Sequence, residues 1–392
     1  MKTSLEEITL SKEELERYSR HLILPEFNIE GQKKLKNARV LVVGTGGLGA
    51  PLLLYLTAAG VGTIGIVDFD VVDISNLQRQ VLFTTADIGR PKVEAAAERL
   101  KALNPHIRFE VFNKRLDSSN ALELITLFDV VADGTDNFQT RYLVNDACVL
   151  AGKVNVFASI FRFEGQASVF NYRYPDGTRG PNYRDLFPTP PPPGLVPSCA
   201  EGGVLGVLPG ILGSLQANEV IKVISGVGEP LVGRLFQFDA ASFTTKIYKI
   251  AKDPDNPLTG MNASQTGLID YDYFCGIHFA PKPKEEHADE IEVATLKEWI
   301  RSGKDFQLID VREPFEYAIA NIGGTLIPKN EIMTHIDQID RNKDVVFLCK
   351  SGIRSRDVIN RLRKEAGLTN LYNVTGGITA WAIEIDPSLP KY

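Results

Sequence analysis

The chain has 392 residues, of which 44% are hydrophobic and 23% charged, and its formal net charge is −6. This length suits two domains, and the acidic balance argues against general affinity for nucleic acid or membrane surfaces. The N-terminus lacks a signal-peptide pattern, no run matches a membrane span, and the four widely spaced cysteines form no CxxC pair, so we expect a cytoplasmic protein without disulfides.

The first predicted elements are a helix over residues 11–20 and a buried strand over residues 39–43. The strand runs into the turn GTGGLG, which contains Gly44, Gly46 and Gly47, and an apolar helix over residues 50–59 follows. Glycines in such a turn let backbone N–H groups approach a phosphate, and the helix N-terminus favours negative charge. The pattern indicates a nucleotide at a Rossmann-like sheet, although a tight turn alone would look the same.

A second strand over residues 63–68 ends on Asp68, where a ribose of either NAD or ATP would need an acid. The next two loops separate these cofactors. NLQRQ contains Asn76 and Arg79, and GRPK ends on Lys92 at the start of another helix. Cations beside the nucleotide suit a triphosphate, because negative charge develops on its oxygens when the α-phosphate is attacked.

Residues 130–137, VVADGTDN, read as a further buried strand that runs into Asp133, Asp136 and Asn137. An acid at the carboxyl end of a strand facing a triphosphate is a reasonable Mg²⁺ ligand, and a helix cap or turn residue is the alternative. Spacing does not choose between Asp133 and Asp136, which is followed by Asn137.

From residue 154 the pattern changes to strands without regular helices between them, which predicts an antiparallel extension of the sheet. A long helical stretch covers residues 205–224, and a proline-rich crossover loop over residues 188–198 ends on Cys199. Cys199 is either a small buried thiol or a reactive one. Cys148 lies in a helical run and is expected in the core, whereas Cys275 has no predicted role.

Residues 280–289 read as a linker, because they are rich in proline and charge. They divide the chain into domains over residues 1–279 and 290–392. In the second domain a strand over residues 344–349 ends on Cys349, and CKSGIRS leads into a helix over residues 357–365. Backbone N–H groups at that helix N-terminus would stabilise a thiolate, and Arg354 adds a cation for an anionic sulfur donor.

The first domain resembles the MoeB/ThiF adenylyltransferases, relatives of ubiquitin-activating enzymes. The resemblance rests on ERYSRHLILPEF, GTGGLG, DFDVVDISNLQRQ, IGRPKVEAA, DGTDN, FRFEGQ and CAEGGVLGVLPGILGSLQANEVIK. It implies an α/β fold with a Rossmann-like mixed sheet and an antiparallel extension, and a homodimer that uses ATP and Mg²⁺.

The resemblance also implies roles for individual residues. The glycines Gly44, Gly46 and Gly47, together with Asp68 at the ribose and Asn137, would bind the nucleotide. The phosphates would be contacted by Asn76, Arg79 and Lys92, and by Arg20 from the partner subunit, although Arg20 read alone is a solvated charge. Asp136 would hold Mg²⁺, Asp133 would be structural, and Cys199 would be the reactive thiol.

The chain departs from this family at one place. Many members hold a structural zinc with two CxxC pairs, and at those positions this sequence has Asn182, Asp185, Asn256 and Thr259. Two amides, a carboxylate and a hydroxyl are a poor zinc set, so we expect no zinc.

The second domain resembles a single rhodanese domain through LIDVREPFEYAIANIGGTLIP, VVFLCKSGIRS and NVTGGITAW. This implies a small α/β domain in which Cys349 carries a persulfide inside a loop completed by Lys350, Ser351, Gly352, Ile353 and Arg354. Asp310 and Arg312 resemble the family's structural pair, and Glu316 its usual acid. Asn321 stands where the family has histidine, and we expect only a modest effect.

Together the two resemblances imply that the enzyme adenylates the C-terminal Gly-Gly carboxylate of a small ubiquitin-like carrier protein. Cys349 would then deliver sulfur from an upstream cysteine desulfurase or from thiosulfate, giving a carrier thiocarboxylate for molybdopterin, thiamin or related synthesis. Tethering the two domains supports this order by raising the effective concentration of the sulfur donor. One alternative is an enzyme of a protein-conjugation route whose rhodanese domain only docks partners. Another is an NAD-dependent oxidoreductase, against which the NLQRQ and GRPK loops count.

Overall fold

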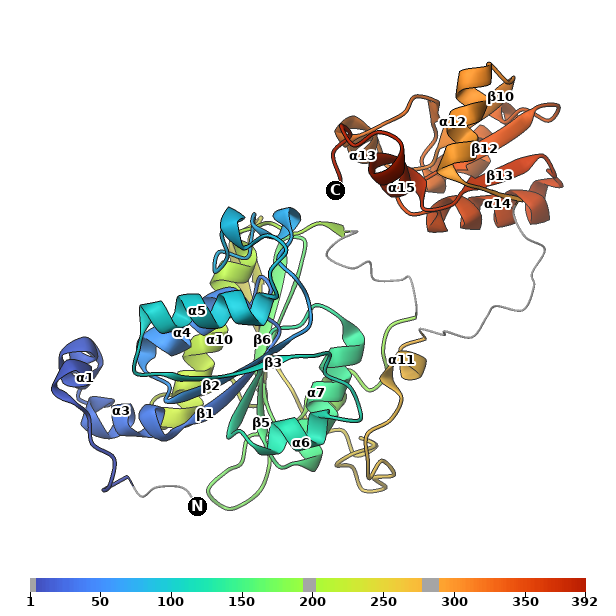
Figure 1. The fold of residues 1–392 in the computed structure, drawn as a ribbon. Helices are drawn as coiled ribbons and strands as arrows, with labels where there is room; N and C mark the ends of the chain where they lie inside the picture. Colours follow the sequence, from blue (N-terminus) through green and yellow to red (C-terminus); the bar gives the residue numbers. More distant parts are fainter. Residues whose placement is uncertain (1–4, 193–201, 277–288) are drawn as a thin grey trace. The chain divides into compact units, whose positions relative to one another are not determined.

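The computed structural model describes residues 5–192, 202–276 and 289–392. The chain divides into two compact units, Met1–Phe279 and Ala280–Tyr392, which are shown in Figure 1 and described one at a time. Cys199 and all but the last residue of the expected linker over residues 280–289 lie outside the described residues, and Asp289 already belongs to a strand.

The N-terminal unit is built on one mixed eight-stranded sheet with the order β3-β2-β1-β4-β5-β6-β7-β8. The first five strands in this order are parallel, and the pairs β5–β6, β6–β7 and β7–β8 are antiparallel. The Rossmann-like sheet with an antiparallel extension is therefore confirmed. The strands are β1 (Arg39–Val43), β2 (Thr63–Asp68), β3 (Arg108–Asn113), β4 (Val130–Asp133), β5 (Val154–Phe161), β6 (Glu164–Phe170), β7 (Arg234–Asp239) and β8 (Thr244–Lys249).

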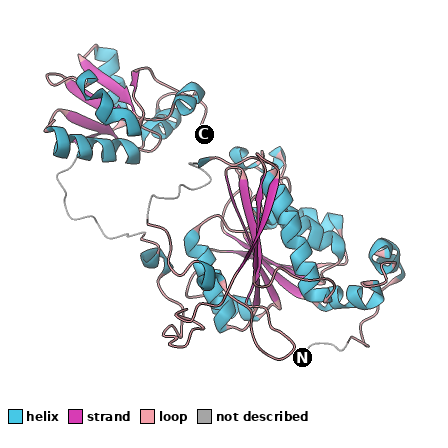
Figure 2. Ribbon diagram, turned by 180° about the vertical axis from the view of Figure 1, so that it is seen from behind, coloured by secondary structure: helices cyan, strands magenta, loops and turns pink. Residues whose placement is uncertain are grey.

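Helices cover both faces of the parallel part, which explains why β1 and β4 are almost continuously apolar (Figure 2). One face packs against α3 (Asn28–Asn37), α4 (Gly49–Ala59), α5 (Lys92–Leu103) and α10 (Leu208–Ser225). The other face packs against α6 (Ala121–Thr126) and α7 (Phe138–Leu150). Short helices α8 (Tyr183–Leu186) and α11 (Tyr271–Phe274) and the 3-10 turns Ile74–Asn76 and Thr85–Asp87 lie in the connections.

The helix expected over residues 11–20 is in fact two helices, α1 (Lys12–Arg17) and α2 (Ser19–Leu22). Ser11 and Glu14 form the capping box at the start of α1, and the break between the two helices falls at Tyr18. The ring of Tyr18 is buried and its hydroxyl accepts a hydrogen bond from Asn104, so packing against α5 overrides the helical pattern.

Helix α10 begins three residues later than expected, at Leu208. The buried Gln216 on this helix donates to the carbonyl oxygens of Asp133 and Val156, at 2.8 and 2.9 Å. These bonds fix α10 against the point where β4 ends.

The C-terminal unit has a parallel five-stranded sheet with the order β11-β10-β12-β13-β9. Both of the chain's tryptophans, Trp299 and Trp381, belong to this unit. Its elements are β9 (Asp289–Ile291), α12 (Val293–Ser302), β10 (Phe306–Asp310), α13 (Pro314–Ile319), β11 (Thr325–Leu326), η3 (Lys329–Gln338), β12 (Asp344–Leu348), α14 (Ile353–Ala366), β13 (Leu371–Val374) and α15 (Gly377–Glu384). In the described part of the chain, no helix is both long and apolar enough to cross a membrane.

Candidate active sites

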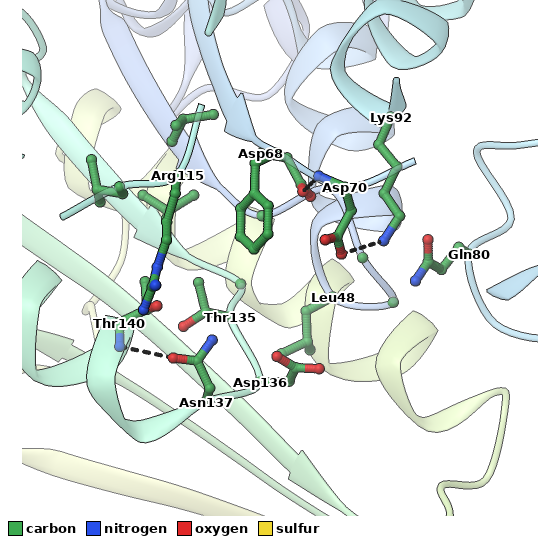
Figure 3. A pocket seen from close by; sticks show the side chains of 18 of the residues that line it. Leu48, Asp68, Asp70, Gln80, Lys92, Arg115, Thr135, Asp136, Asn137 and Thr140 are labelled. Atoms are coloured by element: carbon green, nitrogen blue, oxygen red, sulfur yellow. Dashed lines mark hydrogen bonds and ion pairs between the residues drawn. The ribbon is translucent and has the colours of Figure 1, made fainter. Parts of the chain in front are cut away.

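A pocket of the N-terminal unit lies at the carboxyl ends of β1, β2 and β4 (Figure 3). The chain continues from β1 to β2 on one side, whereas β4 pairs with β1 on the other. Such a reversal of strand order opens a crevice at the strand ends, where open α/β sheets bind their ligands.

The glycine turn forms one wall of this pocket. Gly44, Gly46 and Gly47 line it, directly before the N-terminus of α4. Gly44 has a φ of 89°, and a Cβ on Gly49 would lie 2.0 Å from the carbonyl oxygen of Gly44. Positions 44 and 49 therefore require glycine, and the turn presents backbone N–H groups and a helix N-terminus to an anion.

Asp68 ends β2 and is held in place by three hydrogen bonds. Its carboxylate accepts from the backbone N–H and the hydroxyl of Thr45, at 2.8 and 2.7 Å, and from the backbone N–H of Asp70 at 3.0 Å. A fixed carboxylate that lines the pocket is a suitable acceptor for ribose hydroxyls.

Two of the cations that line this pocket, Lys92 and Arg79, were predicted from the sequence. The side chain of Lys92 is 6% exposed, and its Nζ lies 2.9 Å from Oδ2 of Asp70. Arg79 donates from Nη1 to the carbonyl oxygen of Ser75 at 3.0 Å. Both side chains are thus positioned before any ligand arrives, which suits the binding of a polyphosphate.

The two acids after β4 have different surroundings. Asp133 is fully buried and accepts from the N–H and hydroxyl of Thr135, and its Oδ2 has no partner among the described residues. Burial raises the pKa of Asp133, whereas hydrogen bonds from Thr135 act in the opposite direction. Asp136 is exposed and lines the pocket beside Asn137, which caps α7 through the N–H of Thr140. Of the two acids, the position of Asp136 fits a metal ligand.

Two of the residues expected at the nucleotide are not among the described residues that line this pocket. The side-chain oxygen of Asn76 accepts from the backbone N–H of Asp73 and caps the turn that carries Arg79. Arg20 is exposed on α2. Within one subunit, therefore, Asn76 stabilises the loop that carries Arg79, and Arg20 is not part of the pocket lining.

Sequence reasoning missed several polar residues of the pocket, namely Asp70, Gln80, Lys114, Arg115, Thr135 and Thr140. Gln80 is 4% exposed, and its Oε1 has no hydrogen-bond partner among the described residues. Arg115 forms an ion pair with Asp272 at 3.0 Å. Gln80 could have been found because it belongs to the NLQRQ loop, but nothing in the local sequence indicates Arg115.

At the positions where many members of the family hold zinc, this chain has a hydrogen-bonded cluster of side chains. Asn182 donates to the hydroxyl of Thr259 at 3.1 Å, and Asn256 donates to the carboxylate of Asp185 at 2.7 Å. That carboxylate also accepts the backbone N–H groups of Asn182 and Asp253. These donors and acceptors satisfy one another and include no thiolate or imidazole, so the residues do not fit zinc. We refer to Asn182, Asp185, Asn256 and Thr259 as the polar cluster.

Two cysteines of the N-terminal unit are structural. Cys148 is fully buried in the core, as predicted, and burial raises its pKa. Cys275 packs into the same core, and burial raises its pKa to about 11. Neither environment favours the thiolate.

In the C-terminal unit, β12 is followed by residues 349–354, which we call the sulfur loop. Cys349 is fully buried, and its Sγ accepts the backbone N–H of Gly352 at 3.1 Å. The carbonyl oxygens of Cys349 and Lys350 accept N–H groups of Ile378 and Thr379 in the first turn of α15. A Cβ on Gly377 would lie 2.3 Å from the carbonyl oxygen of Cys349. The TGG motif therefore lets α15 pack against the loop and turn its carbonyl groups away from the sulfur. The helix after the loop begins at Ile353 rather than at residue 357 as expected.

An ion pair holds the last residue of this loop. Arg354 binds Glu316 through both guanidinium nitrogens, at 2.7 and 2.6 Å. Burial alone would raise the pKa of Glu316, but hydrogen bonds from Arg354 and the backbone N–H of Glu313 bring it below its ordinary value. Asp310 and Arg312 form a fully buried pair, and Arg312 also donates to the carbonyl oxygen of Ala320. Asn321 is exposed and donates to the carbonyl oxygen of Tyr317.

Two family models match the chain. The ThiF family matches residues 18–258, and the rhodanese-like domain matches residues 292–384. The chain belongs to the ThiF family and carries a C-terminal rhodanese-like domain.

Relatives with the same pair of domains define the class further. The chain is 50% identical over 386 residues to a probable adenylyltransferase/sulfurtransferase, MoeZ, of Mycobacterium tuberculosis, covering 98% of this chain and 96% of that protein. It is 40% identical over 412 residues to the adenylyltransferase and sulfurtransferase MOCS3 of Sus scrofa, covering 98% and 89%. A sulfur carrier protein adenylyltransferase of Thermus thermophilus is 53% identical over 267 residues, covering 68% of this chain and 98% of that protein. The protein is an enzyme of the adenylyltransferase and sulfurtransferase class.

Solved structures agree on the fold. Crystal structures of E. coli MccB with a MccA derivative and with ATP superpose with TM-scores of 0.56 and 0.52, at 23% and 24% identity. They cover 64% and 62% of this chain, and 76% and 74% of those chains.

Proposed function

We propose that the N-terminal unit transfers AMP from ATP to the C-terminal Gly-Gly carboxylate of a small ubiquitin-like sulfur-carrier protein. The observation that carries this proposal is the presence of Arg79, Lys92 and Asp136 in one pocket with the glycine turn and Asp68. A carboxylate that attacks a phosphate brings two anions together, so cations must be in place before the reaction begins.

The residues have the following roles in this account. The N–H groups of the glycine turn and the side chains of Arg79 and Lys92 bind the phosphates, and Asp68 accepts the ribose hydroxyls. Asn76 caps the turn of the NLQRQ loop that carries Arg79, and Asn137 lies beside the nucleotide. Asp136 would hold Mg²⁺, which neutralises phosphate charge when bound. The enzyme acts as a homodimer, and Arg20 of the partner subunit completes the phosphate site.

The reaction produces a carrier acyl-adenylate and pyrophosphate. A persulfide on Cys349 then attacks the acyl carbon, forming a C–S bond as the C–O bond to AMP breaks and AMP departs with the electron pair. An external thiol attacks the Sγ of Cys349 and forms a mixed disulfide, which releases the carrier thiocarboxylate. A second external thiol reduces that disulfide, and a cysteine desulfurase or thiosulfate reloads Cys349. Cys199 is the candidate for a reactive thiol that attacks the acyl-adenylate or receives sulfur.

We place the reaction in the cytoplasm, and the product would serve molybdopterin, thiamin or related synthesis.

Mass spectrometry of a Gly-Gly-ending carrier tests this proposal. Incubation with the enzyme, ATP, Mg²⁺, thiosulfate and a thiol should replace one carboxylate oxygen of the carrier by sulfur. Cys349→Ala should abolish the replacement, and the matched variant Cys275→Ala should keep it because the Cys275 thiol is buried in the core. Thiocarboxylate formation by Cys349→Ala at the native rate would overturn the role of the rhodanese-like domain and favour the docking alternative.

A further inference from the structure

The side chain of Tyr392 lies between two cations of the C-terminal unit. Its hydroxyl accepts a hydrogen bond from Nη1 of Arg312, and Nζ of Lys350 lies over its ring, 5.0 Å from the centroid. Lys350 directly follows Cys349 in the sulfur loop. Tyr392 comes after α15, and Figure 1 shows the end of the chain beside α13 and α15. One aromatic ring therefore joins a buried guanidinium group to the sulfur loop.

Arg312 gives the ring of Tyr392 a fixed position. The guanidinium group is fully buried, is paired with Asp310, and donates to the carbonyl oxygen of Ala320 at 2.8 Å. An arginine side chain has only donors, so the hydroxyl oxygen of Tyr392 serves as the acceptor. Moving the ring away would remove one acceptor from a buried charged group, which costs free energy.

The anchored ring is a suitable contact for the ammonium group of Lys350. Burial raises the pKa of Tyr392, although Arg312 acts in the opposite direction, so the phenol carries no charge near neutral pH. A cation over an aromatic ring is attracted by the negative face of the ring. The backbone of Lys350 is also fixed, because its carbonyl oxygen accepts the N–H of Thr379 at 3.1 Å. The ring contact thus limits where the flexible lysine side chain can place its charge.

A cation beside the sulfur loop matters for the loading of Cys349 by thiosulfate, because both reactants are anions. The Cys349 thiolate attacks the outer sulfur of thiosulfate, and an S–S bond forms. The bond between that sulfur and the sulfonate breaks with its electron pair on the departing sulfite. Arg312 and Arg354 each pair with a carboxylate, which offsets their charges. An ammonium group that is already in place reduces the repulsion between the reactants without reorganisation during the reaction.

We propose that Tyr392 is a positioning residue that holds the Lys350 ammonium group beside the sulfur loop, where this group binds an oxyanion of a reactant of Cys349. The inference rests on the sulfur transfer proposed above. Two reactants carry such an oxyanion: thiosulfate has its sulfonate, and the carrier acyl-adenylate has its phosphate. Separate assays of loading and of transfer to the carrier distinguish the two.

The direct test is competitive alkylation of Cys349 in the full-length protein by iodoacetate and iodoacetamide, which are similar in size but differ in charge. The ratio of the two products on the Cys349 peptide, read by mass spectrometry, reports the local charge, because both reagents attack the same thiolate. Tyr392→Leu should lower the iodoacetate share about two- to fivefold, the size expected for one partly exposed charge contact. Tyr392→Phe keeps the ring but loses the bond to Arg312, so a smaller decrease is expected.

A second substitution separates the cation contact from a general change of the unit. In a Lys350→Met background, Tyr392→Leu should leave the product ratio unchanged. Phe315→Leu, at an exposed position of α13, is the matched control and should keep the native ratio. An unchanged ratio in Tyr392→Leu, or an equal decrease with and without Lys350, would overturn the proposal. Fluorescence of Trp299 and Trp381 checks that each variant is folded.

Kinetics identify the reactant that carries the oxyanion. If it is thiosulfate, Tyr392→Leu should raise the KM for thiosulfate about two- to fivefold with little change of kcat in sulfur transfer to cyanide, an assay that needs neither ATP nor carrier. If it is the acyl-adenylate, the same variant should instead slow thiocarboxylate formation by enzyme that was loaded with sulfur in advance. No change in either assay would overturn the proposal. Because alkylation needs no sulfur donor, failure of the native protein to transfer sulfur, with the product ratio shifted as expected, would overturn the proposed function and leave the positioning of Lys350 by Tyr392 standing.

Discussion

The ammonium group of Lys92 and the carboxylate of Asp70 lie 2.9 Å apart, and the backbone N–H of Lys92 also donates to the carbonyl oxygen of Asp70. Asp70 follows β2, and Lys92 begins α5. The double contact fixes the lysine at the wall of the glycine-turn pocket, where its side chain is only 6% exposed.

Lys92→Ala should lower carrier-dependent ATP–pyrophosphate exchange by roughly 10²–10³-fold, the usual loss for one preorganised charge partner of a transition state. Asp70→Asn should cost less, because the backbone bond between the two residues remains. Lys101→Ala, at an exposed position of the same helix, is the matched control and should keep native exchange. Equal losses for Lys92→Ala and Lys101→Ala would contradict the assignment.

Arg20 is expected to act across the dimer. Arg20→Ala and Lys92→Ala should each be inactive in exchange, and co-expression of the two chains should restore about a quarter of native activity, because half of random dimers are mixed and each mixed dimer has one intact site. Exchange assays on the purified mixed population measure this. Absence of any restoration would show that Arg20 does not serve the partner's site.

The polar cluster should stabilise the N-terminal unit without metal. Asp185→Ala leaves Asn256 and two backbone N–H groups without their acceptor, which should lower the free energy of unfolding by about 1–3 kcal/mol. Asp255→Ala, an exposed neighbour, should change it little. Calorimetry of the full chain tests both variants, and a chelator should leave the native melting temperature unchanged. A large chelator effect would mean that a metal is part of this unit.

The pair of Glu316 with Arg354 predicts a pH dependence of stability. The pKa of Glu316 is lower in the folded protein than the ordinary value of 4.5. The contribution of Glu316 to the free energy of unfolding is therefore present above pH 4.5, and it is lost as the pH falls through the folded-state pKa. Glu316→Gln should therefore destabilise the C-terminal unit near neutrality and should flatten the loss of stability below about pH 5. Both tryptophans lie in this unit, so tryptophan fluorescence during thermal unfolding reports it within the full chain. Glu331→Gln is an exposed control, and an identical acid slope in native protein and Glu316→Gln would contradict the expectation.

Much of the fold could be predicted because its signals are local. The strands β1 and β2 begin and end at the predicted residues, since short β-branched runs bounded by glycine or an acid are typical of buried parallel strands. The break at Tyr18 could not be predicted, because it depends on a hydrogen bond to Asn104 far along the chain.

The candidate sites show the same difference between local sequence signals and contacts that depend on the fold. The glycine turn and the sulfur loop are contiguous motifs and could be located from sequence. Which side chain of the NLQRQ loop faces the pocket depends on the three-dimensional turn, and there Gln80 lines the pocket whereas Asn76 caps the loop. For the polar cluster, the sequence shows only that the zinc-binding cysteines are absent. The hydrogen bonds of the cluster could not be predicted, because they join residues more than 70 positions apart.

The most direct test of the division of labour is ATP–pyrophosphate exchange by the purified full-length enzyme with Mg²⁺ and a Gly-Gly-ending carrier. The account predicts carrier-dependent exchange that is lost in Asp136→Ala and kept in Cys349→Ala, because adenylation needs only the N-terminal pocket. Exchange that persists in Asp136→Ala, or that disappears in Cys349→Ala, would contradict it.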